Sequence, residues 1–186
     1  MLFRSTQTDI QQFLAVYPES DFDNATQRFE VATGEPDVRC GRSIIGLAAA
    51  QKSKAFTYRY NQRPSTQPAS DPEVHHSAEN WMMFRGTSTG FNGTTTFQPQ
   101  TPLDQAFAEE LIAYWLSFVR AGDPNTFKLD RSPEWPAYTV QGKERIVLQE
   151  PKTNDTSISG SITEQEPKLE TSRCAFVASK AVHEQA

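Results

Sequence analysis

A 25-residue stretch, TPLDQAFAEELIAYWLSFVRAGDPN at 101–125, restricts what this chain can fold into more than any other segment. Its apolar residues recur every three or four positions, which is the spacing of one face of an α-helix. Thr101 and Asp104 have the spacing of a capping box, and Pro102 suits the first helical position. Gly122 is typical of a helix end. The sequence therefore predicts a long helix that begins after Thr101 and ends at Gly122.

The other patterned segments predict an open α/β sheet. KAFTYRYNQR at 54–63 alternates aromatic with other side chains and predicts a strand, and RIVLQ at 145–149 predicts a shorter one. Residues 41–53 predict a helix before the first strand, and residues 63–73 predict a Pro-rich loop after it. A strand, a loop and then a long helix is the order that such a sheet has near its end.

The two ends of the chain are less strongly patterned. In the N-terminal stretch, the positions of Ile10, Phe13, Leu14 and Tyr17 predict an amphipathic helix. Residues 150–172 are polar and weakly patterned, which predicts a mobile loop. The 186 residues are expected to form a single partial domain.

The composition excludes two classes of partner. The net charge is −5 and the pI is about 5.2, with no stripe of Lys and Arg, so no nucleic-acid surface is expected. No apolar run has the length that crosses a bilayer. The N-terminus lacks an apolar core followed by a cleavage site, so no signal peptide is expected in this chain.

The chain has only three histidines, and two of them are adjacent in EVHHSAENWMMF at 73–84. His76 and Glu79 have the i, i+3 spacing of di-iron bundles, and His75 would be a further ligand. Such sites need a second copy on another helix, and only His183 remains, so no metal and no other cofactor is expected. A histidine on a loop that follows a strand is instead a candidate general base, with Glu79 placed to bond the loop backbone.

The sequence GTSTG at 86–90 has the G-x-S-x-G pattern of a nucleophile elbow. That motif requires a buried strand before the serine and a helix directly after it. Here Ser88 is followed by a Gly- and Thr-rich stretch, and it comes after the histidine pair rather than before it. We therefore interpret the segment as a turn.

The stretch HSAENWMMFRG resembles the histidine motif of the type-B carboxylesterase family, which includes fungal lipases and cholinesterases. In that motif a histidine is followed by two small residues, a glutamate and an apolar run. His76 matches the catalytic histidine and Glu79 the glutamate, whereas His75 matches the variable residue before them. The resemblance implies that His76 is the general base of a serine hydrolase with carboxylic-ester substrates.

The resemblance covers roughly residues 17–180 of the 186. The segment FAEELIAYWLSFVRAGDPN, the following PEWPAY and then RIVLQ are similar to the late helix, turn and strand of the family. Cys40 and Cys174 have no C-x-x-C spacing, and by themselves are either two buried thiols or one disulfide. They resemble a pair that is disulfide-bonded in several family members, which implies the disulfide.

The resemblance implies the C-terminal portion of an α/β-hydrolase, an incomplete sheet with flanking helices. The family places its nucleophile elbow, acidic triad member and oxyanion loop upstream of this region, so the chain is expected to be inactive and marginally stable alone. Pro72, Glu73 and Val74 stand where the family has a glycine before the histidine. A non-catalytic adhesion or scaffold protein of the same fold is the alternative.

Three sequons, at Asn24, Asn92 and Asn154, are candidate N-glycosylation sites. They are typical of a secreted protein, and secretion is expected for the parent enzyme. A lipid interface is expected for the parent only.

Overall fold

The computed structural model describes residues 6–70, 73–89 and 95–184, and the chain divides into two compact units. One unit consists of Phe56–Ala137 and Glu144–Gln165, and it contains all the described strands. The other unit contains the remaining helices and the non-helical segment Tyr138–Lys143. The histidine pair belongs to the first unit.

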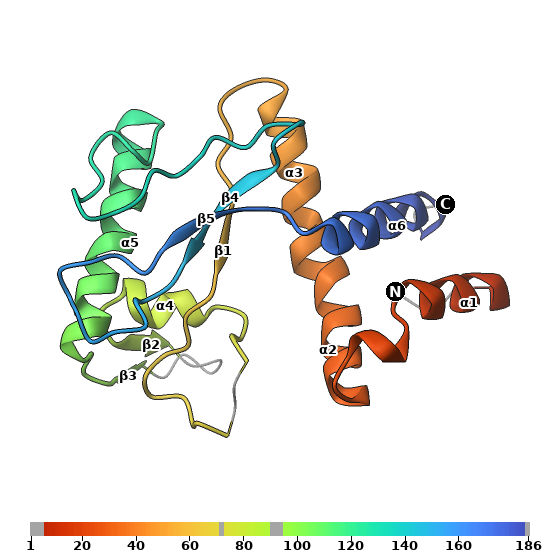
Figure 1. Cartoon of the computed structure of the whole chain (residues 1–186), viewed down its shortest axis with the longest axis horizontal. Coiled ribbons are helices and arrows are strands. Elements are labelled where there is room, and N and C mark those ends of the chain that lie inside the picture. The colour runs from red at the N-terminus through yellow and green to blue at the C-terminus, as the bar shows by residue number, and fades with distance from the viewer. Residues whose placement is uncertain (1–5, 71–72, 90–94, 185–186) are drawn as a thin grey trace. The chain divides into compact units, whose positions relative to one another are not determined.

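The first unit contains a three-stranded sheet in the order β1-β4-β5, made of Tyr58–Tyr60, Glu144–Leu148 and Ile162–Gln165. β4 runs parallel to β1 and antiparallel to β5 (Figure 1). Ile146, Val147 and Leu148 are completely buried. Because successive side chains of a strand point to opposite faces, the burial of all three shows that both faces of β4 are covered, which explains its continuous apolar run.

The sheet confirms two of the predicted strands and corrects one loop. β4 matches the predicted strand at 145–149, and β1 occupies only the middle of 54–63. The prediction of one loop over 150–172 was wrong, because this segment contains β5 and the first turn of a helix that begins at Lys168. β5 is polar because it is held by charge pairing: Glu164 accepts hydrogen bonds from Nε of Arg59 at 3.0 Å and of Arg145 at 2.7 Å.

The predicted long helix is α5, Pro102–Ala121, and both of its ends are confirmed. Thr101 Oγ1 accepts the Asp104 backbone N–H at 3.2 Å, while the Asp104 carboxylate accepts the Thr101 backbone N–H at 2.8 Å. Gly122 ends the helix at φ +69°, a conformation that glycine adopts readily because it has no Cβ.

The core of this unit lies between α5, the sheet and a short helix, α4, at Ala78–Met83. Aromatic rings supply much of it, with Trp135 in edge-on contact with Tyr58 and Tyr114. Tryptophan rings packed in this way contribute beyond their buried area. The buried members of the core are Trp81, Met82, Phe107, Ala108, Leu111, Tyr114, Trp135, Ile146 and Leu148.

The GTSTG segment does not form the predicted turn. Its central residues are β2, Thr87–Thr89, which pairs antiparallel with β3, Thr95–Phe97. Ser88 lies opposite Thr96 in this two-stranded sheet. Gly86 precedes it at φ +90°, and a Cβ there would lie 2.2 Å from the carbonyl oxygen of Gln98. The glycine is therefore explained by hairpin packing.

The second unit consists of helices. α2 (Ala25–Gly34), a π-helical turn (Glu35–Arg39) and α3 (Cys40–Ala50) follow one another without a break (Figure 1). This unit also contains α1 (Gln7–Val16) and α6 (Lys168–Glu184). α3 confirms the helix predicted over 41–53.

The predicted N-terminal helix is α1, but its apolar face is incompletely covered. Ile10 is 38% exposed and Leu14 is 47% exposed. Tyr17 is completely buried, directly after the helix, and its ring lies 4.9 Å from that of Phe13. The periodicity therefore identified the helix correctly but did not determine how much of its face is buried.

A disulfide and a buried ionic cluster hold α3 and α6 together. Cys40 and Cys174 form the disulfide that the family resemblance implies. Beside it, the guanidinium of Arg42 lies 2.5 Å from Glu166 and 2.7 Å from Glu170. Tyr138 donates a hydrogen bond to Glu166 at 2.8 Å, and burial, followed by this contact, raises the pKa of Tyr138 to about 12.

Candidate active-site segment

His76 lies on the loop that leaves the carboxyl end of β1. The loop extends from the end of β1 at Tyr60 to the start of α4 at Ala78. In open α/β sheets, ligands bind outside the carboxyl ends of the parallel strands, and catalytic side chains are often on loops at this edge. The parallel pair of β1 and β4 therefore gives this loop a position suited to chemistry.

The histidine pair is accessible in this structure. His75 and His76 are both exposed, and His76 Nδ1 lies 2.9 Å from Oγ of Ser77. Ser77 has a left-handed backbone, at φ +66°, and α4 begins at the next residue. An exposed imidazole can exchange protons with a group brought to it, which is what a general base requires.

Glu79, the predicted supporting residue, is half-buried in the first turn of α4. Burial, and after it the negative charge of Glu79, raises the pKa of Tyr58 on β1. The carboxylate is therefore close enough to β1 to act on that tyrosine. A hydrogen bond from the loop backbone to Glu79 stays a prediction.

The apolar run after Glu79 anchors this segment in the core. Trp81 and Met82 are 4% and 0% exposed, whereas Phe84 is 66% exposed. Nε2 of Gln100 donates to the carbonyl oxygen of Met82 at 3.0 Å. Because α4 has only six residues, this packing rather than helix propensity must fix the position of the histidine loop.

A buried carboxyl pair supports the other end of the loop. Nε2 of Gln62 donates to Glu150 at 2.8 Å, and the Glu150 backbone N–H donates to Oε1 of Gln62 at 3.1 Å. Burial and, after it, the negative charge of Asp104 raise the pKa of the Glu150 carboxyl to about 8. Asp104 is 1% exposed and also caps α5. The Glu150 carboxyl therefore holds its proton to a higher pH than an exposed glutamate does.

The carboxyl pair predicts that stability falls as the pH rises. Unfolded Glu150 releases its proton near pH 4.5 and folded Glu150 near pH 8, so the folded chain binds the extra proton between these values. The free energy of unfolding should therefore decrease across this window. Glu150→Gln should remove the decrease and exceed the wild type by about 2 kcal/mol above pH 8, allowing for partial exposure.

Urea unfolding of the purified chain at several pH values measures this effect. Glu144→Gln is the matched control, because Glu144 is an exposed carboxylate on the neighbouring strand β4, and it should follow the wild type. Parallel pH profiles for wild type and Glu150→Gln would show that folding does not raise the pKa of Glu150.

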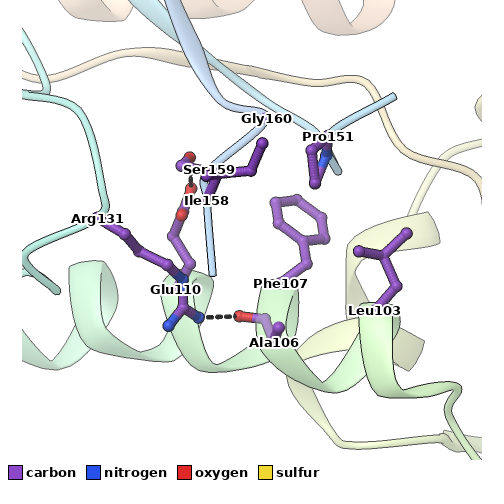
Figure 2. Close-up of a pocket in the computed structure, with 9 residues that line it drawn as sticks. All are labelled: Leu103, Ala106, Phe107, Glu110, Arg131, Pro151, Ile158, Ser159 and Gly160. Atoms are coloured by element: carbon purple, nitrogen blue, oxygen red, sulfur yellow. Dashed lines mark hydrogen bonds between the residues drawn. The ribbon is translucent and has the colours of Figure 1, made fainter. Parts of the chain in front are cut away.

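A small cavity lies beside α5, and Figure 2 shows its lining, which includes no residue of the histidine loop. Its volume is about 10 Å³, which is room for one water molecule at most. The cavity is therefore too small for an ester substrate. One of its lining residues, Glu110, accepts hydrogen bonds from the hydroxyls of Ser159 at 2.8 Å and Ser161 at 2.6 Å. It is lined by Leu103, Ala106, Phe107, Glu110, Arg131, Pro151, Ile158, Ser159 and Gly160.

The remaining predicted sites are on the surface or outside the described residues. Asn24 and Asn154 are exposed, and the Asn24 side chain caps α2 by accepting the Gln27 backbone N–H at 2.9 Å. Asn92 lies outside the described residues. Within the described ranges, no three His, Cys, Asp or Glu side chains form a group that would hold a metal ion. In the same part of the chain, no helix is both long and apolar enough to cross a membrane.

Comparison with known proteins identifies the family. The model of the carboxylesterase family matches residues 4–177, which is most of the chain. The chain belongs to the carboxylesterase family. The matched range includes His76 and Glu79.

Relatives of this carboxylesterase-family chain include fungal and bacterial proteins. "Secreted lipase 4" of Gibberella zeae is 28% identical over 156 residues, which is 77% of this chain and 25% of the lipase. The crystal structure of Aspergillus niger EstA matches 96% of this chain and 33% of its own, with a TM-score of 0.73 and 24% identity. A carboxylesterase of Geobacillus stearothermophilus matches 88% and 31%, with a TM-score of 0.61 and 25% identity.

These structural matches confirm the predicted fold class, a part of an α/β-hydrolase fold. The chain spans about a quarter to a third of the length of the proteins that it matches.

Proposed function

We propose that this chain supplies the general base, His76, of a serine hydrolase that cleaves carboxylic esters. The observation that carries the proposal is the position of His76: exposed, on the loop from the carboxyl end of β1, and in the histidine motif of a carboxylesterase-family chain. His75 shares the exposure but not the motif position. A comparison of the His76→Ala and His75→Ala variants in the full-length protein tests the assignment.

The chemistry follows from the two nitrogens of the imidazole. A serine hydroxyl attacks the ester carbonyl, and Nε2 of His76 accepts the hydroxyl proton as the oxygen–carbon bond forms. When the tetrahedral intermediate collapses, the same nitrogen gives the proton to the departing alcohol oxygen. An acid at Nδ1 orients the ring, and backbone N–H groups stabilise the negative oxygen.

We place the nucleophile, the acid and the oxyanion donors outside these 186 residues. Ser88 lies in the β2–β3 hairpin, where it lacks the sharp strand-to-helix turn that exposes a nucleophile elbow. The family relatives are three to four times as long as their matched parts, which leaves ample chain for the other groups. By itself this chain should therefore hydrolyse esters no faster than a variant without His76.

We further propose an extracellular parent enzyme with a lipid ester as substrate. The named relative from Gibberella zeae is a secreted lipase, and the Cys40–Cys174 disulfide suits an oxidising compartment. Secretion would expose the sequons at Asn24 and Asn154 to glycosylation, and a lipase would meet its substrate at a lipid interface. Peptide mass spectrometry of the native protein tests this, since free thiols and unmodified sequons would contradict it.

A further inference from the structure

The two residues after β1 are bonded to the chain at the end of β4. The Asn61 side chain donates from Nδ2 to Oε1 of Gln149 at 2.7 Å, and its backbone N–H donates to the carbonyl oxygen of Leu148 at 2.9 Å. One residue further on, Gln62 and Glu150 exchange hydrogen bonds of 2.8 Å and 3.1 Å. Paired side chains therefore continue the contact between the two parallel strands beyond their carboxyl ends.

The amide of Gln62 uses both of its polar atoms in these contacts. Nε2 donates to the carboxyl of Glu150 and to the carbonyl oxygen of Arg63 at 3.2 Å, while Oε1 accepts the backbone N–H of Glu150. An amide bonded in this way has one orientation, because the reverse would place its NH₂ group against the N–H of Glu150. The Gln62–Glu150 contact therefore fixes the backbone at the start of the histidine loop.

Further hydrogen bonds cross the loop between this contact and the histidine. Nη1 of Arg63 donates to the carbonyl oxygen of Pro68 at 3.3 Å, and Nε2 of Gln67 donates to that of Glu73 at 2.7 Å. Glu73 lies three residues before His76. On the other side of the histidine the chain enters α4, which is anchored in the core. The loop is therefore braced from its first residues to the backbone close to His76.

The Gln62–Glu150 contact is compatible with a complete enzyme. In the sheet order β1-β4-β5, further strands could join only at the far edge of β1 or at β5, because β4 already has a neighbour on each side. Neither edge lies between β1 and β4, where Gln62 meets Glu150. Neither side chain has a part in the proposed triad, so the contact and the triad can exist together.

We propose that the Gln62–Glu150 contact holds the loop of His76 in its catalytic position and separates as the solution becomes alkaline. The inference rests on the proposed role of His76 as general base. Gln62 and Glu150 are positioning residues, since they act on the base only through the loop.

The pH dependence follows from the surroundings of the Glu150 carboxyl. Its Oε1 is buried and accepts no hydrogen bond in the described part of the chain, so a charge there would be poorly solvated. Burial and then the charge of Asp104, in the first turn of α5, raise its pKa to about 8. Tyr60, at the end of β1, offers no cation: burial and then the charges of Glu150, Glu79 and Asp104 raise its pKa. The contact is therefore stable only while Glu150 is protonated.

Glu150 is the carboxyl that moves when both are charged. The Asp104 carboxylate is fixed, because it accepts the backbone N–H of Thr101 at 2.8 Å and its hydroxyl at 2.7 Å. Glu150 is partly exposed and lies on the chain after β4, so its side chain can turn to water. Gln62 then loses its carboxyl acceptor, and the loop is no longer fixed at its base.

The alkaline side of the turnover profile tests this mechanism in the full-length protein. For hydrolysis of a p-nitrophenyl ester, kcat per folded molecule should fall about 10-fold from about pH 7.5 to about pH 9.5, with little change in KM. Glu150→Gln keeps an acceptor for Gln62 and cannot ionise, so its kcat should fall less than about twofold. Glu144→Gln is the matched control, an exposed carboxylate of β4, and should fall as the wild type does.

Gln62→Leu removes the contact at every pH. Its kcat should be about 10-fold below that of the wild type at about pH 7.5 and should show no further alkaline loss. A purely structural role would reduce the amount of folded protein, measured by circular dichroism at each pH, and leave turnover per folded molecule unchanged. Parallel alkaline losses in wild type and Glu150→Gln, or a wild-type kcat in Gln62→Leu, would overturn the proposal.

Hydrogen exchange of the full-length protein provides a readout that does not need turnover. After correction for the intrinsic pH dependence of exchange, peptides between Gln62 and Ser77 should exchange faster at alkaline pH in the wild type but not in Glu150→Gln. If they do so and His76→Ala retains turnover, the contact holds the loop and the assignment of the base fails. If His76→Ala is inactive while exchange and turnover are the same in wild type and Glu150→Gln, only the positioning role fails.

Discussion

Replacing His76 by alanine in the full-length protein should reduce ester turnover by roughly 10⁴-fold or more, as removal of the base does in serine hydrolases. The adjacent His75→Ala should retain most of the turnover. Both residues are exposed neighbours on the same loop, so the two substitutions perturb the local backbone to a similar extent. Steady-state hydrolysis of a p-nitrophenyl ester measures both variants.

The matched pair removes the main ambiguity of the test. A general loss of folding would affect both variants, whereas loss of the base affects only one. Loss of turnover in His75→Ala with a fully active His76→Ala would show that the motif had been aligned one residue out of register. Full turnover in both variants would show that the base lies elsewhere, whereas absence of turnover in the wild type itself would favour the non-catalytic members of this fold.

The Arg42→Met substitution should lower the free energy of unfolding by about 3–5 kcal/mol, the usual cost of leaving buried charges without their partner. The side chains of Glu166 and Glu170 are only 1% and 8% exposed, and Arg42 contacts both. The disulfide keeps α6 attached to α3, so the loss should appear as weaker packing of the helices rather than their separation. Urea unfolding of the oxidised chain measures it.

A triple variant provides the control. Replacing Arg42 by methionine and both glutamates by glutamine removes the charges together, and the free energy of unfolding should recover to within about 2 kcal/mol of the wild type. An Arg85→Met variant should cost under about 1 kcal/mol, because Arg85 and Glu109 are half-exposed and 3.9 Å apart. A single Arg42→Met variant as stable as Arg85→Met would contradict the assigned role of the cluster.

The elements that could be predicted from the sequence are those whose signals lie within one continuous segment. α5 has its cap, its apolar period and its terminal glycine within one continuous segment, so both ends were predicted correctly. β4 is central in the sheet and its apolar run records that position. β5 was missed because it is stabilised by ionic pairs from Glu164 to Arg59 and Arg145, at separations of 105 and 19 residues. Neither hydrophobic period nor composition records such pairs.

In the candidate site, too, some features could be predicted from the sequence and others could not. His76 could be proposed as the base because its motif is contiguous, and the Cys40–Cys174 disulfide was predicted because the family resemblance implied it. The left-handed backbone of Ser77 could not be predicted, because this conformation has no signature when the residue is not glycine. The raised pKa of Glu150 was missed because Asp104 comes 46 positions earlier and only the fold brings the two carboxyls together.

The GTSTG segment shows the limit of a short motif. The pattern matches a nucleophile elbow in five letters, but the chemistry depends on the strand and helix around them. In this fold the segment begins a hairpin in which Ser88 faces Thr96 on the opposite strand, and Gly86 is required by the approach of Gln98. The prediction that this segment forms a turn was wrong, because its central residues form strand β2. The segment is nevertheless not a nucleophile elbow.

The most direct test of the central claim is ester hydrolysis by the purified 186-residue chain beside its His76→Ala variant. The assay uses a short p-nitrophenyl ester and the monomeric, disulfide-bonded fraction, with matching far-UV circular dichroism as evidence that both proteins are folded. The account predicts equal rates near background, because His76 has no nucleophile to activate within these residues. Rapid turnover by the wild type, lost in the variant, would contradict it and place the nucleophile within the chain, with Ser88 or Ser77 the first residues to replace.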